Sequence, residues 1–138
     1  MVEPKASVVL LGDAGRVLMP RLLFVCGKNR WRSPTAENIF SQDRGVECAS
    51  AGVGRDAETP LSAELIEWAD LILVMERGHK TKLAARFRSH LAGRRVVCLN
   101  IPDQYTFMDP ALVSLLEAKV ARYLPQRQQR EQPASRQD

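Results

Sequence analysis

The chain has 138 residues, enough for one domain of ordinary size and too few for two full ones. Hydrophobic residues make up 45% of it, charged residues 26%, and the net charge is +4, which excludes a disordered or fibrous chain. Its three cysteines form no Cys-x-x-Cys pair, so a disulfide framework or cysteine-based zinc site is not indicated, and a reducing, cytoplasmic setting fits best. The apolar runs are too short for a membrane span or a signal peptide, so no membrane partner is expected.

Both ends of the chain are expected to lie outside the folded domain. Residues 125–138 are mostly Gln, Arg, Pro and Ser, which predicts a disordered tail. Residues 1–19 precede the first clear strand, and Met19 followed by Pro20 would itself make a plausible start, so these residues are interpreted as an extension. The folded domain is therefore expected to span residues 20–124.

Within that domain, short apolar runs alternate with helical patterns. The predicted elements, in chain order, are a strand at 22–25, a helix at 34–44, a strand at 46–49, a helix at 62–69, a strand at 71–75, a helix at 79–91, a strand at 96–99 and a helix at 110–123. Because each parallel return needs a crossover, this alternation predicts an α/β fold. We expect a three-layer sandwich with a four-stranded parallel sheet in the order 2-1-3-4, flanked by helices. Ligands of such sheets bind at the carboxyl ends of the strands.

The most informative segment lies at the end of the first predicted strand. Residues 22–34 read Leu-Leu-Phe-Val-Cys-Gly-Lys-Asn-Arg-Trp-Arg-Ser-Pro, which contains the pattern Cys-x5-Arg-Ser. A loop between a strand end and a helix start presents backbone N–H groups and the positive end of the helix dipole, so a tetrahedral oxyanion fits there. We call residues 26–33 the phosphate loop.

Side chains of the phosphate loop suit phosphoryl chemistry. Cys26, facing inward amides and the Arg32 guanidinium, would favour the thiolate and act as a nucleophile. The planar fork of Arg32 would bind two phosphoryl oxygens. Ser33 is predicted to cap the following helix, with Pro34 at its first position.

The pattern Cys-x5-Arg-Ser also has an alternative explanation that involves no catalysis. Cysteine and arginine at this spacing can occur by chance, and buried cysteines often simply fill the end of a core strand. The other two cysteines, Cys48 and Cys98, do not match the pattern. The preceding strand, the Ser-Pro helix start and a later acidic loop favour the functional interpretation of Cys26.

Between residues 21 and about 123 the sequence resembles the low-molecular-weight protein-tyrosine phosphatases, most closely a short, compact bacterial branch. The resemblance rests on Cys-x5-Arg-Ser after the strand, on Ser33-Pro34-Thr35-Ala36-Glu37, on Ser50-Ala51-Gly52 after the second strand, and on residues 69–75 and 101–105. It implies a phosphomonoester hydrolase that works through a cysteinyl-phosphate and needs no cofactor or metal.

The resemblance also assigns roles to individual residues. Cys26 is implied to be the nucleophile, Arg32 the transition-state clamp and Ser33 a hydroxyl donor to the thiolate. Asn29 and Ser50 would brace the loop; the alternatives are a left-handed turn residue for Asn29 and a surface turn for Ser50, and both interpretations can hold together. The implied phosphate-binding residues are Gly27, Lys28, Asn29, Arg30, Trp31 and Ser33.

A carboxylate after the last strand is the implied general acid and base. Asp103 would protonate the leaving oxygen and then activate the hydrolytic water, unless it is only a turn residue. Asp109 competes for this role, but Asp before Pro at a helix start is better explained as an N-cap. Tyr105 and Trp31 are candidate walls for the substrate ring, with packing against neighbouring loops an equal alternative.

Three departures from the family pattern bear on specificity and regulation. Trp31 stands where many relatives carry a second cysteine able to protect the nucleophile by a disulfide, and Gln104 replaces the proline of the usual Asp-Pro-Tyr, which would loosen the acidic loop. The connection between Gly52 and Asp70 is shorter than in typical members, so a preference for phosphotyrosine does not follow from the resemblance.

The remaining charged residues and the two histidines are not expected to have a catalytic or metal-binding role. His79 and His90 have no partners at ligand spacing, so exposed helix positions are favoured over a metal site. Lys28, Arg30 and Arg55 would make the rim positive, or simply be solvated. The chain lacks a basic stripe with interleaved aromatics, so no nucleic-acid partner is expected.

Two alternatives to a phosphatase stay open. An arsenate reductase shares the fold and the anion loop but relays oxidation through further cysteines, and Cys98 has no partner near it in the sequence. A non-catalytic module would bind a phosphorylated partner without turning it over. The expected partner is a phosphorylated protein or a small aryl phosphate, with inorganic phosphate or sulfate able to occupy the loop.

Overall fold

The computed structural model describes residues 19–42 and 44–125. Its centre is a parallel sheet of four strands in the order β2-β1-β3-β4, formed by β1 (Arg21–Cys26), β2 (Glu47–Gly52), β3 (Leu71–Val74) and β4 (Arg95–Cys98). The predicted α/β class, the parallel sheet and the strand order 2-1-3-4 are confirmed. Of the extension expected at residues 1–19 and the tail expected at 125–138, residues 1–18 and 126–138 lie outside the described residues.

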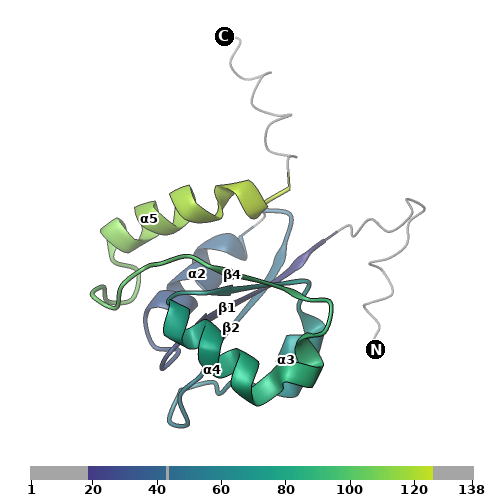
Figure 1. The fold of residues 1–138 in the computed structure, drawn as a ribbon. Coiled ribbons are helices and arrows are strands. Elements are labelled where there is room, and N and C mark those ends of the chain that lie inside the picture. Colours follow the sequence, from purple (N-terminus) through teal and green to yellow (C-terminus); the bar gives the residue numbers. More distant parts are fainter. Residues whose placement is uncertain (1–18, 43, 126–138) are drawn as a thin grey trace, which may run out of the picture.

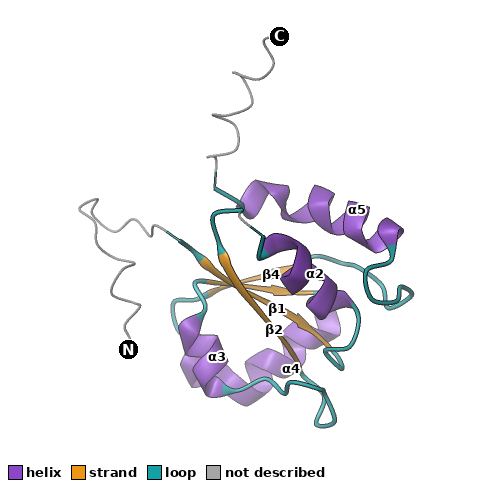
Figure 2. Ribbon diagram, turned by 180° about the vertical axis from the view of Figure 1, so that it is seen from behind, coloured by secondary structure: helices purple, strands orange, loops and turns teal. Residues whose placement is uncertain are grey.

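Helices cover both faces of the sheet. Figures 1 and 2 show α2 (Arg32–Phe40) and α5 (Pro110–Val120) on one face, and α3 (Ala63–Trp68) and α4 (Arg77–Phe87) on the other. Within the described ranges no helix combines the length and apolarity needed to cross a membrane. The molecule is thus the expected sandwich of three layers, with the strand ends and their loops left open at the rim.

Strand β1 supplies side chains to both layers of core. Leu22 and Phe24 point into the cluster beneath α2 and α5, whereas Leu23 and Val25 point into the cluster beneath α3 and α4. This alternation follows from the two-residue period of a strand, and all four side chains are fully buried. The rings of Phe24 and Phe40 stack with centroids 5.7 Å apart and tie α2 to the strand. Cys26 is therefore held at the end of the most deeply buried element.

Strand β2 is longer at its carboxyl end than the sequence predicts. Ser50, Ala51 and Gly52 were expected to follow the strand, but they are its last three residues and pair with Phe24, Val25 and Cys26. Small, turn-like residues occur in this strand because the phosphate loop packs against it. A Cβ atom at Gly52 would lie 2.6 Å from the carbonyl oxygen of Gly27.

The helix boundaries also differ from those expected. Helix α2 begins at Arg32 instead of Pro34 and ends at Phe40 instead of Arg44. Pro34 is accommodated at the third helical position because the N–H groups of the first turn have no intrahelical partner. Helix α4 begins two residues before His79 and continues as a 3-10 turn, Arg88–Leu91, and α5 ends in a 3-10 turn, Ala121–Tyr123.

Gly52→Ala is expected to destabilise the fold and weaken anion binding together. Its Cβ would lie 2.9 Å from the backbone nitrogen of Asn29 and 2.7 Å from the Ala57 Cβ, so the phosphate loop must shift. Thermal unfolding and calorimetric titration with inorganic phosphate measure both effects. Gly78→Ala is the control, since a Cβ there meets nothing within 4 Å. Unchanged stability and phosphate affinity in Gly52→Ala would contradict the close packing of loop on strand.

Candidate active site

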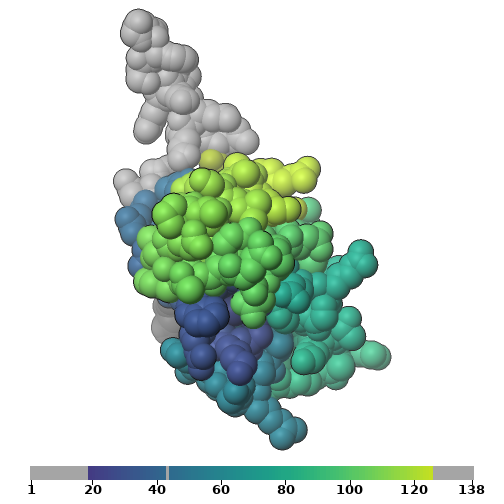
Figure 3. Space-filling view, turned by 90° about the vertical axis from the view of Figure 1, so that its left-hand side faces the viewer, coloured from purple at the N-terminus to yellow at the C-terminus, as the bar shows by residue number. Residues whose placement is uncertain are grey.

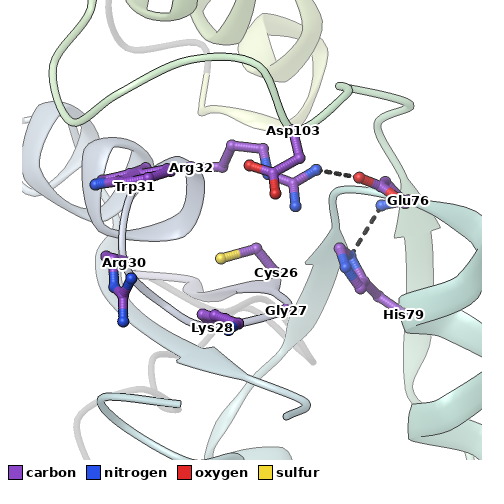
Figure 4. A pocket seen from close by; sticks show the side chains of 9 residues that line it. All are labelled: Cys26, Gly27, Lys28, Arg30, Trp31, Arg32, Glu76, His79 and Asp103. Carbon is purple, nitrogen blue, oxygen red and sulfur yellow. Dashed lines mark hydrogen bonds and ion pairs between the residues drawn. The ribbon is translucent and has the colours of Figure 1, made fainter. Parts of the chain in front are cut away.

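A cavity of about 310 Å³ opens at the carboxyl ends of β1 and β3. Figure 4 shows the thiol of Cys26 on its floor, the Arg32 and Asp103 side chains above it, and Glu76 and His79 at one side. The cavity is lined by Cys26, Gly27, Lys28, Arg30, Trp31, Arg32, Glu76, His79 and Asp103. Most of the residues expected to bind phosphate therefore surround a single cavity, joined by Glu76 and His79, which were not expected there.

The Cys26 sulfur accepts hydrogen bonds within the phosphate loop. The backbone N–H of Asn29 donates to Sγ at 3.2 Å, and the Ser33 hydroxyl lies 3.0 Å from the same atom. Donors aimed at sulfur stabilise a thiolate more than a thiol. The phosphate loop thus directs two polar groups of its own at the Cys26 sulfur.

Asn29 braces the loop in the way the sequence suggests. Its backbone is left-handed, with φ of 56°, and its side-chain amide donates to the hydroxyl oxygens of Ser33 at 3.0 Å and Ser50 at 2.9 Å. Ser50 in turn donates to a carboxylate oxygen of Glu37. Ser50 is buried at the end of β2, so the alternative of a surface turn is wrong for this residue.

The backbone of the loop is oriented by the segment that follows β2. The carbonyls of Cys26, Gly27 and Lys28 accept hydrogen bonds at 2.8–3.0 Å from the N–H groups of residues 53, 54 and 58. Because C=O and N–H point in opposite directions across a trans peptide, the loop amides are turned the other way, toward the cavity. The Asn29 N–H, which reaches Cys26, shows this orientation directly. Such a ring of amides is suited to a tetrahedral oxyanion.

Ser33 does not cap the helix, contrary to the expectation. The N-cap of α2 is Trp31, which makes no side-chain capping bond, and Ser33 lies inside the first turn and is fully buried. Its hydroxyl contacts Cys26, Asn29 and, at 3.4 Å, the carbonyl of Ala51 on β2, so it makes no capping bond to the N–H groups of the helix. The contacts at sulfur displace the capping role that local sequence favours.

Arg32 is buried although it carries a charge, and three acceptors hold it. Its Nη1 donates to a carboxylate oxygen of Glu76 at 2.5 Å and to the carbonyl of Ile101 at 2.7 Å, and its Nε lies 3.7 Å from a carboxylate oxygen of Asp103. A buried guanidinium with an opposite charge and a carbonyl is preorganised at low cost in side-chain freedom. Glu76, which the sequence analysis did not single out, follows the end of β3, where functional groups of parallel sheets gather.

Asp103 lies in a loop that is anchored on both sides. The Ile101 carbonyl is held by Arg32, and the N–H of Met108 donates to the Thr35 hydroxyl at 2.9 Å. Gln104 uses the N–H that the expected proline would lack, because it donates to the carbonyl of Pro102 at 3.0 Å and closes a tight turn around Asp103. The Asp103 side chain is 59% exposed at the cavity mouth.

Asp109 and Tyr105 lie away from the cavity. Asp109 caps α5 by accepting from the N–H of Ala111 at 2.9 Å, with Pro110 at the first helical position, as the sequence predicts. Tyr105 is partly buried against the core beneath α2 and α5 and is not among the described residues that line the cavity. Trp31 does line the cavity and is 39% exposed, so it remains the candidate wall.

The cations at the rim are paired instead of free. Lys28 lies 3.4 Å from Asp56, and Arg30 lies 3.6 Å from Glu58, with all four side chains largely exposed. The acidic residues come from the same segment that orients the loop backbone. The rim next to the phosphate loop is thus less positive than its lysine and arginine suggest.

His79 is buried at the cavity wall, and the expectation of an exposed helix position is wrong. Only 8% of it is exposed, and its Nδ1 accepts a hydrogen bond from the backbone N–H of Glu76 at 3.1 Å. Burial, reinforced by the nearby Arg32, lowers the pKa of His79 below its ordinary value. The ring is thus neutral, with its proton on Nε2. Among the described residues no group of three or more His, Cys, Asp or Glu gathers as a metal site.

The other cysteines lie too far from Cys26 to exchange with it. Cys48 is four residues before Gly52 on β2, which pairs with Cys26, a separation of about 13 Å along the strand. Cys98 is two strands away across the sheet, about 9.6 Å between backbones. A disulfide needs Cα atoms about 4.4–6.8 Å apart. Burial also raises the pKa of Cys48 to about 12, so this residue stays a thiol at neutral pH.

His79→Gln is expected to flatten the dependence of stability on pH. Glutamine still offers an acceptor to the Glu76 N–H but does not titrate. Because the pKa of His79 is lowered in the fold, the unfolded chain takes up this proton first, so stability falls as pH drops below about 6.5. Urea unfolding at neutral and mildly acidic pH measures this, with His90→Gln as the control. An equal loss of unfolding free energy on acidification in the native protein and in His79→Gln would contradict a neutral, buried His79.

Comparisons with known proteins bear on the whole arrangement. A family model described as low molecular weight phosphotyrosine protein phosphatase matches residues 21–67. A protein-arginine-phosphatase of Geobacillus stearothermophilus is 34% identical over 91 residues, covering 49% of this chain and 62% of that protein. The matching part of the chain therefore spans less than two thirds of that relative.

Solved structures agree with the fold. The YwlE arginine phosphatase from Geobacillus stearothermophilus matches with a TM-score of 0.61 at 26% identity, covering 83% of this chain and 96% of the other. Vibrio vulnificus Wzb, solved with benzylphosphonate, matches with a TM-score of 0.62 at 23% identity, covering 76% and 97%. With Cys-x5-Arg-Ser wrapped around one cavity, the chain is similar to the low-molecular-weight phosphotyrosine protein phosphatases in sequence over residues 21–67 and in fold.

Proposed function

We propose that this protein is a cysteine-dependent phosphomonoester hydrolase that forms a cysteinyl-phosphate on Cys26. One observation carries the proposal: the Cys26 sulfur accepts from the Asn29 N–H and lies 3.0 Å from the Ser33 hydroxyl, at the floor of a cavity walled by Arg32 and Asp103. A nucleophile, a clamp for phosphoryl oxygens and a carboxyl group thus face one space. A free thiol as the nucleophile fits a reducing compartment.

In the first step, the thiolate of Cys26 attacks phosphorus and the bond to the leaving oxygen breaks. The loop amides and the Arg32 guanidinium bind the non-bridging oxygens, on which charge accumulates in the transition state. Asp103, protonated and facing the cavity mouth, gives its proton to the leaving oxygen. The alcohol departs and the phosphoryl group remains on sulfur.

In the second step, water attacks the phosphorus of the cysteinyl-phosphate. The carboxylate of Asp103 takes the proton of this water, the bond between phosphorus and sulfur breaks, and inorganic phosphate leaves. Cys26 returns as the thiolate, supported by Ser33 and Asn29. Arg32 stays in place throughout because the Glu76 carboxylate and the Ile101 carbonyl accept hydrogen bonds from it.

The geometry disfavours the two alternatives. An arsenate reductase needs a second cysteine to take over the oxidised state, and neither Cys48 nor Cys98 lies within disulfide reach of Cys26. A module that only binds phosphate needs no carboxyl group at the cavity mouth. The loop carrying Asp103 is nevertheless tied to Arg32 and to Thr35, and Gln104 stabilises its turn.

The substrate class has two candidates. A phosphate ester on an aromatic ring, as in phosphotyrosine, fits a cavity with Trp31 at its edge. The relative named protein-arginine-phosphatase favours a second candidate, phosphoarginine, whose cationic group would meet Glu76 and Asp103. We propose the aryl phosphate as the better substrate, because Trp31 offers an exposed aromatic face at the cavity, whereas the Glu76 carboxylate is already paired with Arg32.

Hydrolysis of phenyl phosphate and 4-nitrophenyl phosphate in the presence of EDTA tests the mechanism. Cys26→Ser is expected to abolish turnover while still binding phosphate. Asp103→Asn should lower kcat about 10²–10⁴-fold for phenyl phosphate and less for the nitrophenyl ester, whose leaving group needs little protonation.

Asp109→Asn is the matched control, because asparagine preserves the cap of α5 and lies away from the cavity. Equal effects of Asp103→Asn on both esters would refute its role as the acid. Full activity in Cys26→Ser would refute the covalent mechanism itself.

The two substrate candidates are separated by kcat/KM for peptides of one sequence that carry phosphotyrosine or phosphoarginine. The proposal predicts faster hydrolysis of the phosphotyrosine peptide. Trp31→Ala should narrow the difference, since it removes the aromatic face at the cavity that favours a substrate ring. Faster hydrolysis of the phosphoarginine peptide by the native protein would instead identify phosphoarginine as the substrate class.

A further inference from the structure

A groove of about 740 Å³ runs along one face of α4 beside the end of β4. We call it the basic groove; it is lined by Arg77, Lys80, Thr81, Ala84, Ala85, Arg88, Cys98 and Asn100. The α4 residues recur every three or four positions, which is the spacing of one helix face. Small side chains form its floor, and exposed cations stand along its length. This shape lets an extended backbone approach the helix closely.

The cations of the basic groove are not paired with any carboxylate in the part of the chain that the structure describes. Arg77, Lys80 and Arg88 form no ion pair with a carboxylate of residues 19–42 or 44–125, and α4 contains no acidic residue. Arg77 and Lys80 also lie in the first turns of α4, where the helix dipole disfavours positive charge. Their charge is thus unfavourable for the helix itself, so an anion bound in the groove would be favoured by these unpaired cations.

The basic groove is continuous with the active-site cavity. A smaller hollow of about 300 Å³ lies between the two; it shares Glu76 and Asp103 with the cavity, and Arg77 and Asn100 with the groove. Figure 3 shows the same neighbourhood, with the teal residues of α4 beside the green loop that follows β4. A chain leaving the cavity past Asp103 therefore enters the groove directly.

From these observations we infer that the basic groove binds an acidic segment of the phosphoprotein substrate, next to the phosphorylated residue. This inference rests on the proposed phosphatase function and extends it to the sequence around the phosphate. The cations from Arg77 to Arg88 span about 16 Å along the helix, which an extended peptide of roughly five residues covers. Three carboxylates on such a segment would each meet one cation.

A nucleic acid is the weaker fit for the same charges. Single-stranded nucleic acids bind through stacking of bases on aromatic side chains as well as through phosphate contacts. The residues that line the basic groove include no aromatic side chain. Its position beside a phosphomonoester cavity favours a protein segment that carries its own phosphate.

Peptides that share one phosphorylated residue test the inference. The phosphorylated residue, phosphotyrosine or phosphoarginine, is the one that the enzyme hydrolyses faster. One peptide carries three glutamates on the amino-terminal side of this residue and a second carries them on its carboxyl-terminal side. In the control peptides, glutamines replace these glutamates. Because the groove leaves the cavity in one direction, glutamates on one side only should raise kcat/KM, by roughly tenfold at low salt. High salt should remove most of this gain, since the cations are exposed.

The triple variant Arg77→Gln, Lys80→Gln, Arg88→Gln identifies the surface involved. It should lose the preference for the acidic peptide and keep native activity on phenyl phosphate. The control variant Lys82→Gln, Lys119→Gln, Arg122→Gln removes the same charge elsewhere and should keep the preference.

Other outcomes decide against the inference in distinguishable ways. A gain in kcat/KM from glutamates on either side of the phosphorylated residue would indicate a general charge effect and overturn the inference. Loss of the preference for the acidic peptide in both triple variants would do the same. Competition by an oligonucleotide but not by the acidic peptide would assign the groove to a nucleic acid. No hydrolysis of phenyl phosphate by the native protein would remove the proposed function, and the inference with it.

Discussion

The active site depends on the hydrogen bonds of one residue, Asn29. Its left-handed backbone turns the phosphate loop, its N–H reaches the Cys26 sulfur, and its amide binds Ser33 on α2 and Ser50 on β2. One residue thereby ties strand, loop and helix into a rigid unit. The close approach of Gly27 to Gly52 is the steric counterpart of this arrangement, because only a residue without a side chain permits it. The hydrogen bonds that shape the anion site are therefore made among the chain's own residues.

A second network, on the other side of the cavity, fixes the charges. Glu76 and the Ile101 carbonyl hold the buried Arg32, while His79 accepts from the Glu76 backbone. His79 stays neutral because burial and Arg32 both oppose its protonation. This side of the cavity thus contributes a fixed cation, Arg32, and a neutral ring, His79. Glu76, at the turn between β3 and α4, lies beside Arg77, which lines the basic groove.

The sequence predicts the fold and the floor of the site well, because both follow from local patterns. Continuous apolar runs identified the four strands, and Cys-x5-Arg-Ser after the first of them located the cavity. Prediction failed where tertiary contacts outweigh local preference. Ser33 favours an N-cap but is drawn to the Cys26 sulfur, and His79 has a polar helical neighbourhood but faces the cavity. Glu76 becomes meaningful only when β3 is placed beside β1.

The most direct measurement is mass spectrometry of the native protein, quenched in denaturant during turnover of an aryl phosphate. If Cys26 is the nucleophile, one phosphoryl group will be found on the peptide that contains Cys26. A phosphoryl group on another residue, or steady turnover without any phosphorylated protein, would contradict a cysteinyl-phosphate mechanism.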